Sequence, residues 1–183
     1  MKAIVQDRYG EVDVLQLRDI PTPSIKGDDV LIQVRAGGLD PCVWHLVTGL
    51  PYLVRLIGHG LRKHVRGTDV AGVVGTVGNA VRGFQPGDDV FGTCNGSFAE
   101  YTTARPDTLA HKPTNLTFEE AAVAPVSACT ALQAVRNQGR VTTGQRVLII
   151  GAGGGVGTFA VQIAKAYGAE VTGVCSTTKT ELV

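Results

Sequence analysis

The chain has 183 residues, of which 44% are hydrophobic and 18% are charged, and its formal net charge at pH 7 is +1. This balance is typical of a globular protein of one domain or a domain and a half, and it excludes a whole-chain attraction to nucleic acid or to acidic membranes. The four cysteines form no C-x-x-C pair and the first ten residues contain no secretory apolar run, so we expect reduced thiols and a cytoplasmic location.

The part of the chain up to about residue 112 is typical of a β-rich domain. Short stretches rich in β-branched or aromatic residues predict strands at residues 3–6, 30–36, 69–77 and 97–101. Turns rich in glycine and proline separate these stretches. Many short strands between such turns predict a small, partly closed barrel.

The character of the sequence changes after the barrel region. Thr117 and Glu120 have the spacing of a capping box, which predicts a helix that begins directly after the threonine. Pro125 interrupts this helix, and a second helix of about ten residues is expected beyond it. We therefore expect two domains, at residues 1–123 and 124–183.

Residues 147–164, VLIIGAGGGVGTFAVQIA, contain no ionisable side chain. Their number approaches that of a membrane-spanning helix, but five of them are glycines, each of which disfavours a helix by about 1 kcal/mol relative to alanine. The segment is better divided into a strand over 147–150, a glycine turn over 151–157 and a helix over 158–167. A further strand is expected at 170–175, and another helix is expected to start near residue 177.

A strand that leads through a glycine turn into a helix predicts a binding site for the pyrophosphate of a dinucleotide. The first backbone amides of the helix have no internal acceptor, and glycine lets the backbone approach the ligand closely. The residues expected to bind the cofactor here are Gly151, Ala152, Gly154, Gly155, Val156 and Gly157. A turn that serves only the packing of the helix on the strand is the alternative.

The end of the second strand indicates which dinucleotide is bound. An NAD-binding unit usually carries an acidic residue there, which accepts a hydrogen bond from the ribose 2′-hydroxyl. This chain has Ser176, Thr177 and Lys179 instead, and no acidic residue before Glu181. Hydroxyls and a cation can hold a 2′-phosphate, which an acidic residue would repel, so NADP(H) is favoured. Alternatively, these residues only cap the next helix.

The order of these motifs resembles the zinc-independent quinone oxidoreductases, the zeta-crystallin-like group of the medium-chain dehydrogenase/reductase superfamily. The resemblance rests on residues 1–4, 38–41, 67–74, 77–78, 86–92, 96–101, 151–157 and 160–165. It implies an α/β plus β architecture, in which a GroES-like β-barrel domain precedes a Rossmann domain and NADPH binds between the two. Members of the family continue well past residue 183, so the Rossmann domain is expected to be incomplete, with a single parallel βαβ unit.

The resemblance also implies that no catalytic metal is bound. Zinc-using relatives take ligands from a cysteine and a Gly-His-Glu triplet, whereas the matching positions here hold Asp40 and Gly67-Thr68-Asp69. One rival set of zinc ligand types remains, Cys42, His45, His59 and His64. No acidic residue occurs from residue 41 to 68, and the four cations of this stretch disfavour a metal. A loop over the cofactor or substrate, or a solvated basic loop, is favoured instead.

Without zinc, the resemblance implies an acceptor whose own conjugation promotes hydride addition, namely a quinone or an α,β-unsaturated carbonyl. Tyr52 and His45 occupy the segment that borders the active-site cleft in the family, so each is a candidate donor of a hydrogen bond or a proton. Asp40 is a candidate for orienting the substrate or the cofactor. The alternatives are that Tyr52 only packs among its apolar neighbours and that His45 is an ordinary imidazole whose hydrogen bonds are satisfied within the protein.

The leading hypothesis is therefore an NADPH-dependent, zinc-independent oxidoreductase whose partner is a small molecule, not a nucleic acid or a membrane. One alternative is a non-catalytic fragment of such an enzyme. Two parallel strands and one helix leave an open edge and an uncovered face, so the last third of the chain is expected to be marginally stable unless it pairs with a second copy as a homodimer. The other alternative is a protein similar to zinc-type alcohol dehydrogenases that uses the rival ligand set.

Overall fold

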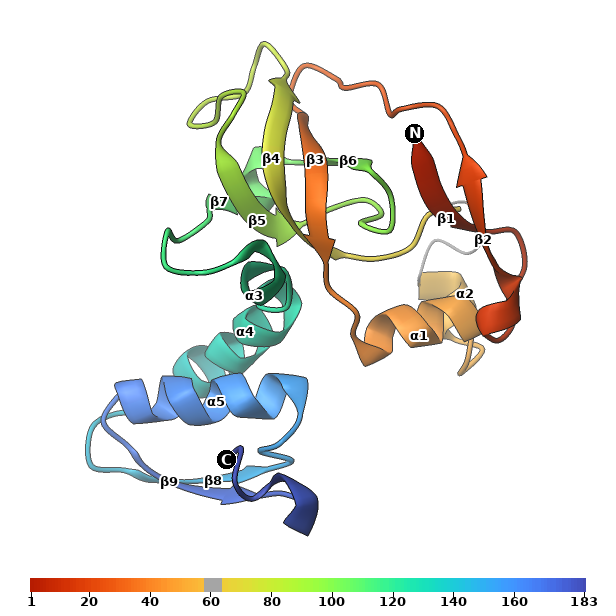
Figure 1. Ribbon diagram of the computed structural model, residues 1–183. Helices are drawn as coiled ribbons and strands as arrows, with labels where there is room; N and C mark the ends of the chain where they lie inside the picture. The colour runs from red at the N-terminus through yellow and green to blue at the C-terminus, as the bar shows by residue number, and fades with distance from the viewer. Residues whose placement is uncertain (58–63) are drawn as a thin grey trace. The chain divides into compact units, whose positions relative to one another are not determined.

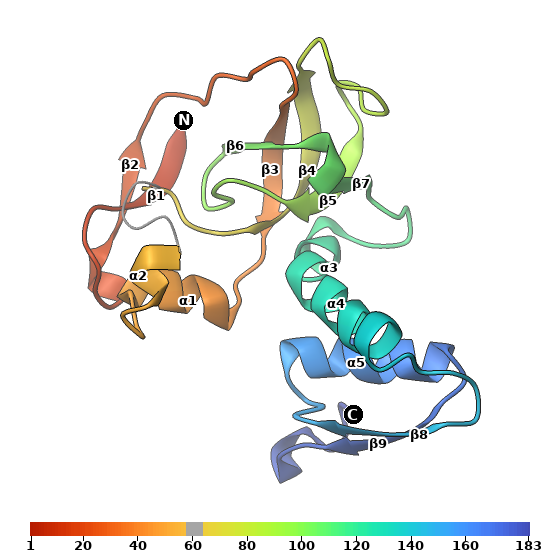
Figure 2. The ribbon, with the colours of Figure 1, turned by 180° about the vertical axis from the view of Figure 1, so that it is seen from behind.

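The computed structural model describes residues 1–57 and 64–183 (Figures 1 and 2). The chain separates into two units, Met1–Pro125 and Val126–Val183. The division falls at the start of helix α4 (Pro125–Leu132), and the expected boundary at residues 123/124 stays a prediction. Within the described part, no helix is both long and apolar enough to cross a membrane.

A five-stranded antiparallel sheet with the order β6-β3-β4-β5-β7 forms the centre of the first unit. Its strands are β3 (Val30–Gly37), β4 (Asp69–Val77), β5 (Asp89–Thr93), β6 (Tyr101–Ala104) and β7 (Leu109–His111). The pairing of β3 with β4 contains two register shifts, which increase the twist of the sheet. The fully buried core side chains are Val30, Ile32, Val70, Val74 and Val90.

The sequence does not predict β5 or β7, and it places β6 four residues too early. β5 and β7 escape the pattern because β5 is interrupted by Gly92 and β7 has only three residues. The strand expected at 97–101 is observed as β6, which begins at Tyr101. Ser97 and Phe98 lie before this strand, and their amides donate to the carbonyl oxygens of Gly67 and Arg66, just before β4.

A separate antiparallel hairpin joins β1 (Lys2–Gln6) to β2 (Leu15–Asp19) through the 3₁₀ turn η1 (Val12–Val14). We predict β1 but not β2 from the sequence, because the apolar alternation of β2 is limited to Leu15 and Leu17, and four of its five residues are exposed. Pairing with β1, for example of Leu17 with Ile4, supplies the order that the local sequence lacks.

Two short helices, α1 (Pro41–Thr48) and α2 (Val54–Ile57), connect β3 to β4, where the sequence analysis expected a loop. Helix α1 begins at an N-cap formed by Asp40, whose side chain accepts a hydrogen bond from the amide of Val43, with a proline at the first helical position. It ends at Gly49, which has a φ of +66°. This left-handed backbone favours glycine and turns the chain toward α2.

The expected capping box is confirmed at the start of α3 (Phe118–Ala122). The hydroxyl of Thr117 accepts from the amide of Glu120, and the carboxylate of Glu120 accepts from the amide of Thr117. Helix α3 buries Ala121 and Ala122 against Ala71 of β4. The helix expected after Pro125 is observed as α4, followed by the π-helical segment η4 (Gln133–Gln138).

The second unit contains β8 (Arg146–Ile150), α5 (Gly155–Ala166) and β9 (Glu170–Val174). The two strands are parallel, with Arg146 opposite Glu170 and Ile150 opposite Val174, so α5 is the crossover helix of a βαβ unit. Its buried core consists of Ala131, Val135, Val141, Ala160 and Ala164. The helix expected from residue 177 is observed as a single 3₁₀ turn, η5 (Thr177–Lys179).

Candidate functional site

The glycine turn between β8 and α5 is tied to the end of the neighbouring strand. The amides of Gly151 and Ala152 both donate to the carbonyl oxygen of Val174, over 2.9 and 3.0 Å. The amide of Gly154 donates to the carbonyl oxygen of Gly151 over 2.9 Å. Gly151 has a φ of +80°, a backbone conformation that a residue with a Cβ adopts only with strain. The loop is therefore built by backbone hydrogen bonds that depend on glycine.

The first amides of α5 are presented outward by this loop. The first backbone hydrogen bond of the helix runs from the amide of Thr158 to the carbonyl oxygen of Gly154, at 2.9 Å. The amides of Gly155, Val156 and Gly157 precede it and have no carbonyl one turn earlier to accept from them. Gly155 and Val156 are exposed. An anion can therefore reach these amides at the positive end of the helix dipole.

Gly157 allows α5 to pack closely on the loop. A Cβ atom at this position would overlap the carbonyl oxygen of Gly151 and would lie 2.8 Å from the Cα of Ala152. Both obstacles are backbone atoms, so they cannot move away as a flexible side chain would. Gly157 is therefore needed for the packing of α5 on the loop, as the alternative to cofactor binding proposes. Gly155 and Val156 are exposed, so this packing does not exclude a ligand at their amides.

The three residues expected at the 2′-phosphate lie directly after β9. Ser176 and Thr177 are exposed, and the hydroxyl of Ser176 is 3.1 Å from that of Thr178. Lys179 folds back onto the glycine loop, where its Nζ atom donates to the carbonyl oxygen of Gly153 over 2.9 Å. The structure therefore brings the Lys179 cation to the glycine loop, and Ser176 and Thr177 follow the strand whose last carbonyl, that of Val174, accepts from this loop. Both features attract a phosphorylated ligand.

Asp40, expected to orient substrate or cofactor, has a structural function in the described molecule. One carboxylate oxygen, Oδ1, accepts from the amide of Val43 over 3.0 Å and caps α1. The other oxygen, Oδ2, is buried and has no hydrogen-bond partner among the described residues. Burial, and secondarily the charge of Asp40, raises the pKa of the nearby Cys42 thiol, which disfavours a reactive thiolate there.

His45 lies on the exposed side of α1, near the helix end. Its Nδ1 atom is 2.8 Å from the carbonyl oxygen of Leu50. A carbonyl only accepts, so Nδ1 carries a hydrogen and the neutral imidazole has its lone pair on Nε2. His45 can therefore accept a hydrogen bond at Nε2 when neutral, and it can donate a proton there only after it is protonated.

Tyr52 lies in the turn before α2, and 71% of its surface is exposed. Its ring contacts the guanidinium group of Arg55, whose Cζ atom is 4.7 Å from the ring centroid. Asp40, His45 and Tyr52 all belong to the first unit, whereas the glycine loop belongs to the second. Arg55 was not singled out by the sequence analysis.

The rival metal ligand set is only partly described. Cys42 and His45 share helix α1, one turn apart, and His59 lies outside the described residues. The Nδ1 atom of His64 is 3.2 Å from a carboxylate oxygen of Asp7. Among the described residues, no group of three or more histidine, cysteine, aspartate or glutamate side chains could hold a metal ion.

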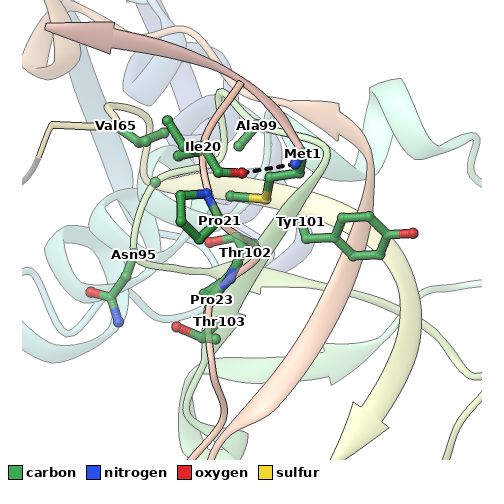
Figure 3. Close-up of a pocket in the computed structure, with 11 residues that line it drawn as sticks. Met1, Ile20, Pro21, Pro23, Val65, Asn95, Ala99, Tyr101, Thr102 and Thr103 are labelled. Atoms are coloured by element: carbon green, nitrogen blue, oxygen red, sulfur yellow. Dashed lines mark hydrogen bonds between the residues drawn. The ribbon is translucent and has the colours of Figure 1, made fainter. Parts of the chain in front are cut away.

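A pocket of about 160 Å³ lies elsewhere in the first unit (Figure 3). Its wall combines the start of β1, the segment after β2 and strand β6, and it includes Met1, Ile20, Pro21 and Thr102. The N-terminal ammonium group donates to the carbonyl oxygen of Ile20 over 2.8 Å, which joins two of these segments. None of the residues predicted to bind cofactor or substrate contributes to it.

Comparison with known proteins shows that the chain is similar to part of several oxidoreductases. Residues 26–114 match the family described as the alcohol dehydrogenase GroES-like domain. The whole chain is 37% identical to the mitochondrial NAD(P)H oxidoreductase RTN4IP1 of Bos taurus, of which it covers 51%. Over 97% of its length it is 38% identical to the quinone oxidoreductase of Sus scrofa, of which it covers 53%.

The same comparison extends to solved structures. The quinone oxidoreductase of Escherichia coli complexed with NADPH is similar over 99% of this chain and 55% of its own, with a TM-score of 0.85 and 26% identity. The chain therefore spans about half the length of the relatives it matches. These similarities confirm the expected architecture, a GroES-like barrel followed by part of a Rossmann fold.

Proposed function

The chain belongs to the medium-chain dehydrogenase/reductase superfamily, as a relative of its quinone oxidoreductases, and from this premise we propose that its glycine loop binds NADPH. We further propose that the complete enzyme transfers hydride to a quinone or an α,β-unsaturated carbonyl without zinc. The relatives named above include an NAD(P)H oxidoreductase, which supports a nicotinamide cofactor. The cytoplasmic location stays a prediction, since that relative is named mitochondrial.

The observation that carries the proposal is the outward-facing start of α5. Three amides without internal acceptors lie at an exposed helix N-terminus, and the loop before them is shaped by glycines. The preference for NADPH over NADH rests on Ser176, Thr177 and Lys179, which supply hydroxyls and a cation where an acidic residue would repel a 2′-phosphate. The residues present therefore fit a phosphorylated dinucleotide.

Bound NADPH supplies the hydride, so the residues of the chain must hold the acceptor and stabilise charge on its oxygen. The exposed hydroxyl of Tyr52 is suited to donate a hydrogen bond to a carbonyl oxygen on which negative charge develops. A protonated His45 can donate from Nε2 to the same kind of oxygen, because its Nδ1 hydrogen is held by the carbonyl of Leu50. Asp40 caps α1 through Oδ1, and its other oxygen, Oδ2, is buried, so any effect of Asp40 on the substrate or cofactor would be indirect, through the position of α1.

The proposal that the enzyme acts without zinc rests on the residue types at two positions. Asp40 and Thr68 stand at the positions where the zinc-using relatives described above carry a cysteine and a histidine. The carboxylate of Asp40 already caps α1 through one oxygen. Metal analysis of the purified protein tests this point, because stoichiometric zinc would favour the alternative that uses Cys42, His45 and the other rival ligands.

Titration of the chain with NADPH, followed by cofactor fluorescence, tests the proposed function. Saturable binding with a preference for NADPH over NADH is the expected result. The absence of saturable binding at millimolar cofactor would favour the second candidate, a folded but non-catalytic fragment. The uncovered face of the β8–β9 sheet, where Leu148 is 62% and Ile150 is 80% exposed, is the observation that favours this candidate.

Replacing Tyr52 with phenylalanine is expected to lower kcat for quinone-dependent NADPH oxidation by roughly 100-fold, the lower range of general acid catalysis. The dissociation constant of NADPH should not change, because the glycine loop belongs to the other unit. Tyr167→Phe, which removes a hydroxyl at the end of α5, is the matched control and should retain the wild-type kcat. An unchanged kcat in Tyr52→Phe would instead assign Tyr52 to packing.

A further inference from the structure

The guanidinium group of Arg55 makes cation–π contacts with two tyrosine rings. Its Cζ atom is 4.5 Å from the ring centroid of Tyr9 and 4.7 Å from that of Tyr52. Its Nε atom also donates to the carbonyl oxygen of Gly49 over 3.0 Å. The side chain thus combines two cation–π contacts with one hydrogen bond. Arg55 therefore joins the end of α1, the start of α2 and the segment after β1.

The two tyrosines differ in how firmly they are held. Tyr9 is half-buried and follows β1, and this segment is fixed to α1 because the amide of Gly10 and the side chain of Gln6 both donate to the carbonyl oxygen of Val47. Tyr52 is 71% exposed and lies in a turn. Arg55 therefore connects an exposed ring, that of Tyr52, to the half-buried ring of Tyr9.

The space around the guanidinium group of Arg55 is tightly filled on the side of Gly49. A Cβ atom at Gly49 would lie 2.5 Å from a ring carbon of Tyr9 and 2.8 Å from the Nε atom of Arg55. The glycine at the end of α1 thus serves two purposes, since it adopts the left-handed backbone and leaves room for the arginine. Arg55 is exposed, but its contacts with Gly49, Tyr9 and Tyr52 hold its guanidinium group in place.

We propose that Arg55 is a positioning residue, which holds the ring of Tyr52 against Tyr9 so that the Tyr52 hydroxyl points in one direction toward the acceptor. This inference rests on the proposed function, in which Tyr52 donates to the substrate oxygen. A lysine cannot take over this task, because an ammonium group lacks the flat faces that contact two rings at once. A small misplacement of a donor lowers the rate without preventing substrate binding.

Arg55→Lys tests the proposal because it keeps the charge and removes the flat group. We expect kcat to fall about tenfold while KM for NADPH is unchanged. In the Tyr52→Phe background the same substitution should change kcat less than twofold, because the hydroxyl that Arg55 orients is already gone. A tenfold fall in both backgrounds would overturn the proposal and assign Arg55 to folding alone. Arg35→Lys, at an exposed position of β3, is the matched control and should behave like the wild type.

A second readout does not depend on activity. The chain has four tyrosines, so their ring signals can be assigned in NMR spectra of tyrosine-labelled protein. In the wild type, contacts between the ring protons of Tyr52 and the side chain of Arg55 are expected, and in Arg55→Lys the Tyr52 signals should shift toward those of a free tyrosine while Tyr167 stays unchanged. Unchanged Tyr52 signals would overturn the proposal. Shifted signals in a chain without NADPH-dependent activity would support the positioning of Tyr52 and refute the proposed function.

Discussion

Gly157→Ala is expected to weaken NADPH binding by at least tenfold, which corresponds to about 1.4 kcal/mol. The added methyl group would overlap the carbonyl oxygen of Gly151 and crowd the Cα of Ala152, so helix α5 must move away from the loop. That movement displaces the amides of Gly155 and Val156, which are proposed to bind the pyrophosphate. The same overpacking should lower the free energy of unfolding by roughly 1–3 kcal/mol. Fluorescence titration and urea denaturation measure the two effects.

The control for this variant is another glycine that has room for a methyl group. A Cβ atom at Gly75 in β4 would lie 3.8 Å from its nearest neighbour, the carbonyl oxygen of Leu31. Gly75→Ala should therefore leave NADPH affinity unchanged. If Gly157→Ala bound NADPH as tightly as the wild type, close approach of α5 to the loop would not be required for binding, and the loop would have to be assigned to packing.

Ser176→Asp is expected to reverse the preference between the two cofactors. A carboxylate directly after β9 would repel the 2′-phosphate of NADPH and accept a hydrogen bond from the 2′-hydroxyl of NADH. At about 4 Å two such charges repel by roughly 4 kcal/mol near a protein surface before screening by salt. We therefore expect the ratio of the dissociation constants for NADPH and NADH to rise by at least tenfold. Parallel titrations with the two cofactors give this ratio.

A charge-matched variant shows whether the effect is local. Lys165→Gln also lowers the net charge by one, but Lys165 is exposed in the last turn of α5, away from the glycine loop at its start. It should weaken NADPH and NADH binding equally and only slightly. If Ser176→Asp also affected both cofactors equally, the residues after β9 would be capping residues of η5 and would not determine the cofactor.

The cofactor loop was predictable from the sequence because its chemistry depends on local residue types. The strand, the glycine turn and the second strand are observed at the expected residues. The start of α5 was predicted at residue 158, because glycine disfavours a helix. The helix instead begins at Gly155 and contains Gly157. Packing against the loop outweighs the intrinsic preference of glycine, which no local pattern reveals.

In the first unit, strands that form only by pairing with residues far away in the sequence could not be predicted. β2 has only a short apolar alternation, at Leu15 and Leu17, and forms by pairing with β1. Helix α1, in contrast, carried a readable signal, because Asp40 followed by Pro41 is a typical N-cap and first helical residue. That signal also explains why Asp40 caps a helix. The arrangement of Arg55 could not be predicted, since it requires Tyr9, Gly49 and Tyr52 to meet in the folded chain.

The central claim is that the backbone amides at the start of α5 bind the phosphates of NADPH. Amide chemical shifts of the isotope-labelled chain, recorded during a titration with NADPH, test it directly. The largest shifts are predicted for the amides of Gly155, Val156 and Gly157, with smaller ones at Ser176 and Thr177. Saturation with NADPH while these five amides stay unshifted would contradict the account.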